Sequence, residues 1–156
     1  MRLKLRPLTA QNFAPFGEVF EPPPVGERTH LAAAFENMRD HARLECYINH
    51  REPTALPHSV LVMERHAYSS QAFMPFRVSR YIAAAAPANA SGGPELLRLQ
   101  AFVARGSQAV NYRTGVWHCP LLVLDEAAQF VVLMWKDGSA ADEEFIQLPE
   151  PLQFVD

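Results

Sequence analysis

Alternation of polar and apolar positions is the main structural signal in this chain. Residues 2–6 alternate charged and apolar side chains, which predicts a half-buried strand. Thr9 is placed to cap a short helix that reaches Phe13 and ends before Pro15 and Gly17. Short runs rich in apolar and β-branched residues predict further strands, at 18–20, 59–66, 78–86, 99–104, 115–124 and 129–135.

The segments between these strands carry weaker signals. Residues 30–35 and 44–49 each fit a strand, although the three alanines at 32–34 support a helix equally well. Proline, glycine and small residues at 87–94 predict a mobile loop, and the polar turn 125–128 predicts a hairpin between its flanking strands. Many short strands with little helix predict an all-β sandwich or barrel rather than alternating βαβ units.

Composition and charge narrow the class of protein. The 156 residues are 49% hydrophobic and 20% charged, which fits one folded domain over residues 1–156. A net charge of -3 gives no basic footprint for nucleic acid. No apolar run is long enough for a membrane span or a secretory signal, so we expect a cytoplasmic protein. The expected partner is a small molecule, with neither nucleic acid nor a membrane involved.

Familiar catalytic motifs are missing from the sequence. There is no glycine-rich phosphate loop, no Gly-x-Ser-x-Gly and no His-Glu-x-x-His, so phosphoryl transfer, hydride transfer and serine hydrolysis have no motif in their favour. We expect no organic cofactor. The two cysteines stand far apart with no Cys-x-x-Cys pair, which argues against a zinc knuckle.

Two polar clusters remain as candidates for chemistry. Glu64 and His66 are two apart on a predicted strand, so their side chains project from the same face. His118 lies in a second polar segment that enters a later strand. The alternatives are a pair of surface neighbours for the first cluster and, for His118, a half-buried imidazole bonded to a backbone carbonyl.

Taken together, the clusters fit a pattern found in cupin barrels. Cupins bring a His-x-His-x3–4-Glu segment together with a histidine from a later hairpin. Here Glu64-x-His66-x4-Gln71 occupies the first position and His118 the second, with Glu in place of the first His and Gln in place of Glu. Imidazole suits Ni and Zn while carboxylate suits harder ions, so the candidate ligands for a Ni, Zn or Mn ion are Glu64, His66, Gln71 and His118.

The chain also resembles the bacterial ureidoglycolate lyases over nearly its whole length. The blocks that carry the resemblance are 7–9, 13–19, 64–66, 71–75, 110–112, 115–118 and 120–121. The resemblance implies a cupin-like double-stranded β-helix barrel, a homodimer, and cleavage of (S)-ureidoglycolate to glyoxylate and urea, with metal stimulation in some members. Members of that family often carry Asn in place of Gly115 and His in place of Cys119, so this site has one imidazole fewer.

The implied reaction needs acid–base chemistry. The substrate hydroxyl must lose a proton while the ureido nitrogen gains one, and imidazoles serve either role at neutral pH. The candidate catalytic residues are His118, His66 and Glu64, with the acid and the base left unassigned. Arginine suits the substrate carboxylate, amide and phenol groups suit the ureido carbonyl, and aromatic rings exclude water. The candidate substrate-binding residues are Arg65, Arg113, Asn111, Tyr112, Gln71, Phe73 and Trp117.

Two other function classes stay open at this stage. One is a metal cupin that acts as an isomerase or a dioxygenase on another small hydroxy or keto acid. The other is a small-ligand-binding barrel with no catalytic activity. Metal analysis distinguishes the first from a ureidoglycolate lyase, and a product assay distinguishes the second.

Overall fold

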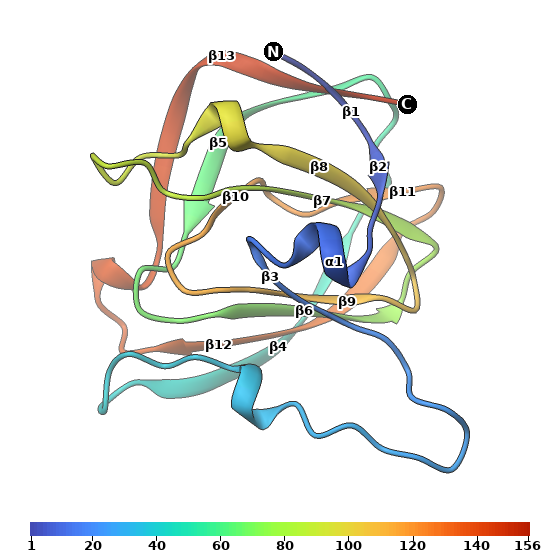
Figure 1. The fold of residues 1–156 in the computed structure, drawn as a ribbon, viewed down its shortest axis with the longest axis vertical. Coiled ribbons are helices and arrows are strands. Elements are labelled where there is room, and N and C mark those ends of the chain that lie inside the picture. Colours follow the sequence, from blue (N-terminus) through green and yellow to red (C-terminus); the bar gives the residue numbers. More distant parts are fainter.

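The computed structural model describes residues 1–156 as two β-sheets that wrap into a barrel (Figure 1). The larger sheet holds β1 (Arg2–Lys4), β2 (Arg6–Pro7), β5 (His58–Arg65), β7 (Arg80–Ala86), β8 (Gln100–Arg105), β10 (Trp117–His118), β11 (Leu122–Leu124) and β13 (Glu144–Val155). The smaller sheet holds β3 (Gly17–Phe20), β4 (Arg43–Arg51), β6 (Gln71–Arg77), β9 (Ala109–Tyr112) and β12 (Ala128–Lys136). Helical segments are short: α1 (Ala10–Phe13) and the 3-10 turns η1 (Ala32–Ala34), η2 (Leu96–Arg98) and η3 (Ala140–Asp142).

The strand order explains how the barrel is assembled. The larger sheet runs β1-β13-β5-β10-β7-β8-β2 with β11 also paired to β7, and the smaller runs β3-β9-β6-β12-β4. Neighbours in each sheet are mostly distant in sequence, as in a double-stranded β-helix. The all-β class and the cupin-like barrel are therefore confirmed. No helix has the length and apolar character needed to cross a membrane.

Strand β7 is buried on both faces and separates two apolar cores. Tyr81, Ala83 and Ala85 belong to a core of 17 residues between the two sheets. The alternate residues Ile82 and Ala84 belong to a second core of 14 residues on the other face. Because side chains alternate along a strand, a residue of the larger sheet faces either the barrel interior or this outer core. The face on which a side chain lies therefore determines whether it reaches the interior of the barrel.

Several predicted elements are confirmed. The strands expected at 18–20, 44–49, 59–66, 78–86, 99–104 and 129–135 match β3, β4, β5, β7, β8 and β12, and the strand expected at 2–6 is divided into β1 and β2. Helix α1 begins at a capping box, in which Asn12 N donates to Thr9 Oγ1 at 3.2 Å and Thr9 N donates to Asn12 Oδ1 at 2.9 Å.

Other predictions are wrong. The expected strand at 115–124 is two strands, because Pro120 lies between β10 and β11 and has no backbone N–H to donate. No hairpin forms: β11 pairs with β7 while β12 pairs with β4 and β6, so the turn 125–128 carries the chain from one sheet to the other. Residues 30–35 form no strand and contain η1 instead. Strands β6, β9 and β13 were not predicted.

The loop at 87–94 is anchored, in contrast to the mobility that its composition predicts. The Gly92 carbonyl accepts hydrogen bonds from Arg65 Nη1 at 2.7 Å and from Trp117 Nε1 at 2.9 Å. Asn89 Oδ1 accepts from the backbone N–H groups of Ser91 and Gly93, both at 3.0 Å. The Asn89 bonds brace the loop internally, and the two bonds to the Gly92 carbonyl tie it to the outer face of the β5–β10 pair.

Candidate functional site

Three residues on or directly after two neighbouring strands converge inside the barrel. Glu64 on β5 is the register partner of His118 on β10, and His66 follows the end of β5. One potential ligand atom from each lies within 4.8 Å of the others, and His118 Nε2 is 3.2 Å from Glu64 Oε1. Both imidazoles are buried, whereas the Glu64 side chain keeps 18% of its surface exposed. We call these three residues the triad. Glu64 is the member whose side chain is partly exposed to solvent.

His118 is held so that its Nε2 faces oxygen acceptors only. Nδ1 donates to the Val116 carbonyl at 3.1 Å, and the ring stacks on Tyr112 with centroids 4.2 Å apart. Nε2 is 3.0 Å from Gln71 Oε1 in addition to its contact with Glu64. A ring nitrogen between two acceptors must carry either a proton or a cation. His118 is therefore arranged as a proton donor or a metal ligand.

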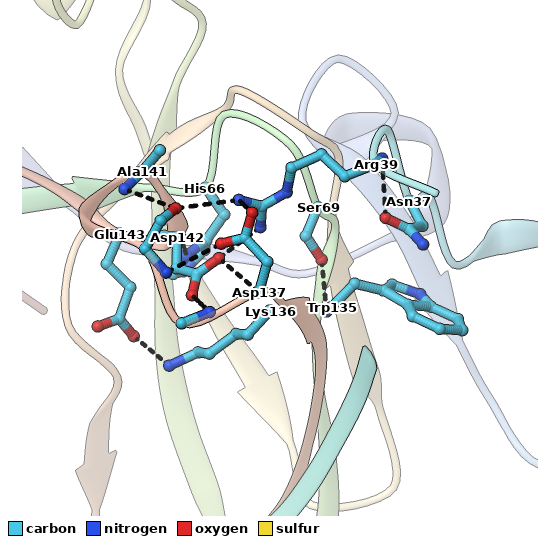
Figure 2. A network of polar contacts seen from close by, with 12 residues as sticks. Asn37, Arg39, His66, Ser69, Trp135, Lys136, Asp137, Ala141, Asp142 and Glu143 are labelled. Atoms are coloured by element: carbon cyan, nitrogen blue, oxygen red, sulfur yellow. Dashed lines mark hydrogen bonds and ion pairs between the residues drawn. The ribbon is translucent and has the colours of Figure 1, made fainter. Parts of the chain in front are cut away.

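His66 has the opposite arrangement. Its Nδ1 donates to the Asp142 carbonyl at 2.9 Å, while Nε2 is buried with no hydrogen-bond partner (Figure 2). Burial lowers the pKa of this imidazole, and the charge of His118 lowers it further; the bond to Asp142 and the charge of Glu64 offset this only in part. His66 is thus a neutral imidazole with an unused lone pair.

Glu64 supplies the negative charge of the triad. Burial by itself raises the pKa of this carboxyl group. The hydrogen bond to His118 and the charges of His118, His66 and Arg51 act in the opposite direction and bring the pKa below its usual value. The carboxylate is therefore ionised at neutral pH and is an acceptor for a proton on His118 Nε2.

The donor set of the triad fits a divalent ion. It offers two imidazole nitrogens and one carboxylate oxygen, with Gln71 Oε1 as a fourth donor beside His118. The 3.2 Å between His118 Nε2 and Glu64 Oε1 is close to the roughly 3.4 Å between neighbouring ligands of a tetrahedral zinc ion. The partnerless His66 Nε2 is an available ligand, and the Nδ1 bond to a carbonyl is the contact that commonly orients metal-bound histidines.

Gln71, Phe73 and Tyr112 also face the barrel interior. Gln71 contacts His118 directly, and Tyr112 stacks on it. Phe73 packs edge-on against Tyr112 at 6.1 Å in the core between the sheets. These three predicted site residues are therefore brought to the triad or next to it.

Arg65 and Trp117 lie on the other face of the same strands. Arg65 Nε and Nη2 donate to Glu144 Oε2 at 2.9 and 2.7 Å, and its guanidinium stacks over the Trp117 ring at 4.8 Å. Trp117 belongs to the outer core. The structure thus directs both side chains away from the triad, because each is adjacent in sequence to an inward-facing residue.

Asn111 and Arg113 are engaged elsewhere as well. Asn111 Nδ2 donates to Glu18 Oε2 at 3.0 Å and to the Ala34 carbonyl at 2.7 Å, on the face of β9 opposite Tyr112. Arg113 pairs with Glu18 at 3.2 Å and lies 3.8 Å from Glu36. Neither side chain makes a hydrogen bond or an ion pair with the triad.

Lys136 is a cation on the interior-facing row of β12 that the sequence analysis did not single out. On β12, Val132 and Met134 face the barrel interior, and Lys136 is the next position on that face. Met134 Sδ is 3.6 Å from Gln71 Nε2, and Lys136 Nζ is 2.9 Å from Glu143 Oε1. The alternation that defines β12 was the signal that pointed to it.

Lys136 lines a polar hollow that contains no triad residue, and its charge acts on Tyr47. Burial raises the pKa of Tyr47, which also responds to the charges of Lys136, Glu143 and Glu64. A hollow of about 390 Å³ with an entirely polar lining adjoins Lys136; its lining residues are His41, Arg43, Glu45, Lys136, Asp137 and Gly138. The largest cavity, of about 610 Å³, lies between β2, β3 and β8, and no triad residue lines it.

Comparison with known proteins gives one consistent family. The family described as ureidoglycolate lyase matches residues 1–154. A ureidoglycolate lyase of Rhizobium etli (strain CIAT 652) is 38% identical over 158 residues, covering 94% of this chain and 93% of that protein. One of Burkholderia mallei (strain NCTC 10229) is 37% identical over 164 residues, covering 99% and 94%. Among solved structures, RmlC from Streptococcus suis in complex with dTDP-D-xylose is 11% identical over 63% of this chain and 46% of that chain, with a TM-score of 0.46.

Proposed function

The chain belongs to the ureidoglycolate lyase family, and we propose that it cleaves (S)-ureidoglycolate to glyoxylate and urea at the triad of Glu64, His66 and His118. The observation that carries the assignment to these residues is the unequal state of two buried nitrogens. His66 Nε2 has no partner, whereas His118 Nε2 faces two oxygen acceptors. One imidazole is suited to accept a proton and the other to donate one.

The reaction uses one base and one acid. The α-carbon of ureidoglycolate carries a hydroxyl group, a carboxylate and the ureido nitrogen. The base removes the hydroxyl proton as the C=O bond of glyoxylate forms, the C–N bond breaks with its electron pair on nitrogen, and the acid protonates that nitrogen to give urea. No water is consumed. Each positioned group typically contributes about 10²–10⁴-fold to the rate.

We assign the base to His66 and the acid to His118. The lowered pKa of His66 keeps its imidazole neutral, with the Nε2 lone pair free to take the hydroxyl proton. Glu64 and Gln71 Oε1 together favour a proton on His118 Nε2, ready for the ureido nitrogen. Gln71, Tyr112 and Phe73 form the inner wall beside the two rings.

Lys136 replaces the two arginines as the proposed cation for the substrate carboxylate. Arg65 and Arg113 already bind the carboxylates of Glu144 and Glu18. Lys136 follows the interior row of β12, and its ammonium group is paired with Glu143. A substrate carboxylate would take the place that the Glu143 carboxylate occupies.

A divalent ion is a second way in which the same residues would act. Glu64, His66 and His118 would hold it, with Gln71 beside them, and Ni, Zn and Mn are the candidates. Such an ion would supply Lewis-acid polarisation of the substrate's oxygen atoms. Metal analysis of the purified protein, followed by assays before and after treatment with a chelator, distinguishes this case from acid–base catalysis by the side chains alone.

A product assay tests the proposed activity. Purified protein is incubated with racemic ureidoglycolate, and glyoxylate, urea and ammonia are measured separately. A lyase gives glyoxylate and urea in equal amounts and stops when the (S) enantiomer is consumed. Ammonia as the main nitrogen product would indicate hydrolysis at the ureido carbonyl and would contradict the proposal.

We further propose that residues 1–156 form a single domain that works as a homodimer in the cytoplasm. The support is the resemblance to the ureidoglycolate lyases over residues 1–154. Light scattering coupled to gel filtration tests the assembly: a mass of one chain would contradict it.

A further inference from the structure

We propose that Arg39 and Asp142 are positioning residues for His66: together they hold the Asp142 carbonyl where it accepts the Nδ1 proton, which leaves Nε2 bare and facing the rest of the triad. Neither residue belongs to the triad, and Arg39 lies outside every strand. The link from this contact to catalysis rests on the proposed function.

Asp142 contacts His66 through its backbone and Arg39 through its side chain. Its backbone carbonyl accepts from His66 Nδ1 at 2.9 Å. Its carboxylate accepts from the backbone N–H groups of Asp137 and Gly138 at 3.1 and 2.8 Å, and from Arg39 Nη2 (Figure 2). The carboxylate contacts therefore fix the position of the residue whose carbonyl binds His66.

Arg39 contacts both Asp142 and Asp137 from a distant part of the chain. It lies 103 positions before Asp142 in the sequence, and its Nη1 also pairs with Asp137 Oδ2 at 2.9 Å. The side chains of Arg39, Asp137 and Asp142 are 10%, 13% and 8% exposed, so water competes little for these contacts. The guanidinium thus clamps the turn 137–142 at its first and last residues.

The consequence for His66 is a choice of tautomer. A neutral imidazole in water favours the form protonated on Nε2, and in a protein the hydrogen bond made by one ring nitrogen decides which one carries the proton. A carbonyl accepts but cannot donate, so the fixed Asp142 oxygen requires a proton on Nδ1. Without it, Nε2 would take the proton and lose the lone pair that both proton abstraction and metal binding require.

The tautomer of His66 can be measured directly. Protein labelled with ¹⁵N-histidine and dialysed against a chelator is studied without substrate at pH 8, and long-range ¹H–¹⁵N correlations report which ring nitrogen is protonated. We expect His66 in the Nδ1–H form in the natural protein and a shift toward the Nε2–H form in Arg39→Ala. Turnover of ureidoglycolate by Arg39→Ala should fall about 10–100-fold, the usual effect of losing a partner that orients a site histidine. Arg39→Lys keeps the positive charge, so its turnover should lie between those of the natural protein and Arg39→Ala.

The control is Arg80→Ala. Arg80 makes a two-bond contact with Asp125 at 2.8 and 2.6 Å, so its loss also removes an Arg–Asp pair, but one that contacts no triad residue. We expect it to leave the His66 tautomer unchanged. If Arg39→Ala does not fold, Asp142→Asn weakens the clamp while it keeps the backbone carbonyl, and the same shift is expected.

Two results would overturn the inference. One is an Nε2–H tautomer of His66 in the natural protein, and the other is an unchanged Nδ1–H tautomer in folded Arg39→Ala or Asp142→Asn protein. The measurement is independent of the proposed activity because no substrate is present. A shifted tautomer in Arg39→Ala combined with no urea from the natural protein would support the clamp and reject the ureidoglycolate assignment.

Discussion

Each face of the β5–β10 strand pair carries a cluster of charged and polar side chains. The two clusters differ in whether their polar atoms have hydrogen-bond partners. On the outer face, Arg65 uses Nε, Nη1 and Nη2 in hydrogen bonds, and the Trp117 ring lies against it. On the inner face, His66 Nε2 bonds to nothing and His118 Nε2 meets only acceptors. The outer cluster is complete within the chain, and the inner one is not.

We propose that this difference separates a structural cluster from a reactive one. A buried polar atom left without a partner costs about 1–3 kcal/mol. Arg39 Nε, Asn111 Oδ1, Thr114 Oγ1 and Trp135 Nε1 are also buried without partners, so the inner cluster is distinguished by an unpaired nitrogen that lies beside Glu64 and His118. The inner cluster keeps an unpaired nitrogen, which a substrate proton or an ion would satisfy. Substitutions on the inner face should therefore affect turnover, and those on the outer face should affect stability.

The largest expected effect is that of His118→Asn. Removing the proposed acid should lower turnover about 10²-fold or more, with little change in the melting temperature. Rate and melting temperature are measured on one preparation, with His50→Asn at an exposed position as the control. A stable, fully active His118→Asn protein would remove this residue from the mechanism. A strong loss of stability with turnover spared would make it a structural histidine.

A smaller effect is expected for Lys136→Met. Hydrogen bonds to charged groups contribute about 1.5–3 kcal/mol, so loss of the cation for the substrate carboxylate should raise KM by roughly 10–100-fold. Lys136→Arg keeps the charge and should recover most of the loss. Steady-state kinetics separate KM from kcat. An unchanged kcat/KM in Lys136→Met would show that another group binds the carboxylate.

The smallest effect concerns Cys119, which follows His118 but faces the outer core. Burial, with a smaller contribution from Glu64, raises the pKa of this thiol to about 12, so almost no thiolate exists at pH 8. Cys46 is exposed. A disulfide reagent at pH 8 should therefore titrate one thiol per native chain and a second only after unfolding. Native Cys46→Ser protein should have no thiol that reacts. Two thiols that react rapidly in the native protein would place Cys119 at an open site.

Much of the site follows from the spacing of residues along strands. Alternation places Glu64 and His66 on one face, and the structure brings His118 to them. The same rule places Arg65, which lies between Glu64 and His66, and Trp117, which precedes His118, on the other face. The sequence interpretation grouped these residues by segment and so included two that point away. Applied strictly, alternation would have excluded them.

Other features depend on contacts that no local pattern reveals. The strands β6 and β13 contain Pro75 and Pro149, which interrupt the pattern expected of a strand, and β9 is only four residues long. The hairpin prediction failed because turn chemistry at 125–128 does not indicate which sheet receives the next strand. The Arg39–Asp142 contact joins segments 103 positions apart, so only the folded chain shows it.

One pair of matched variants tests the central comparison most directly. Glu64→Gln and Glu144→Gln make the same chemical change on opposite faces of β5, in carboxylates that pair with His118 and with Arg65. Turnover and the free energy of unfolding are measured for both. We expect Glu64→Gln to lose about 10²-fold in kcat/KM with little change in stability. We expect Glu144→Gln to keep its turnover and to lose up to about 1 kcal/mol of stability, as for a partly exposed ion pair. Equal losses of turnover in both variants, or a fully active Glu64→Gln protein, would contradict the assignment of the inner face to catalysis.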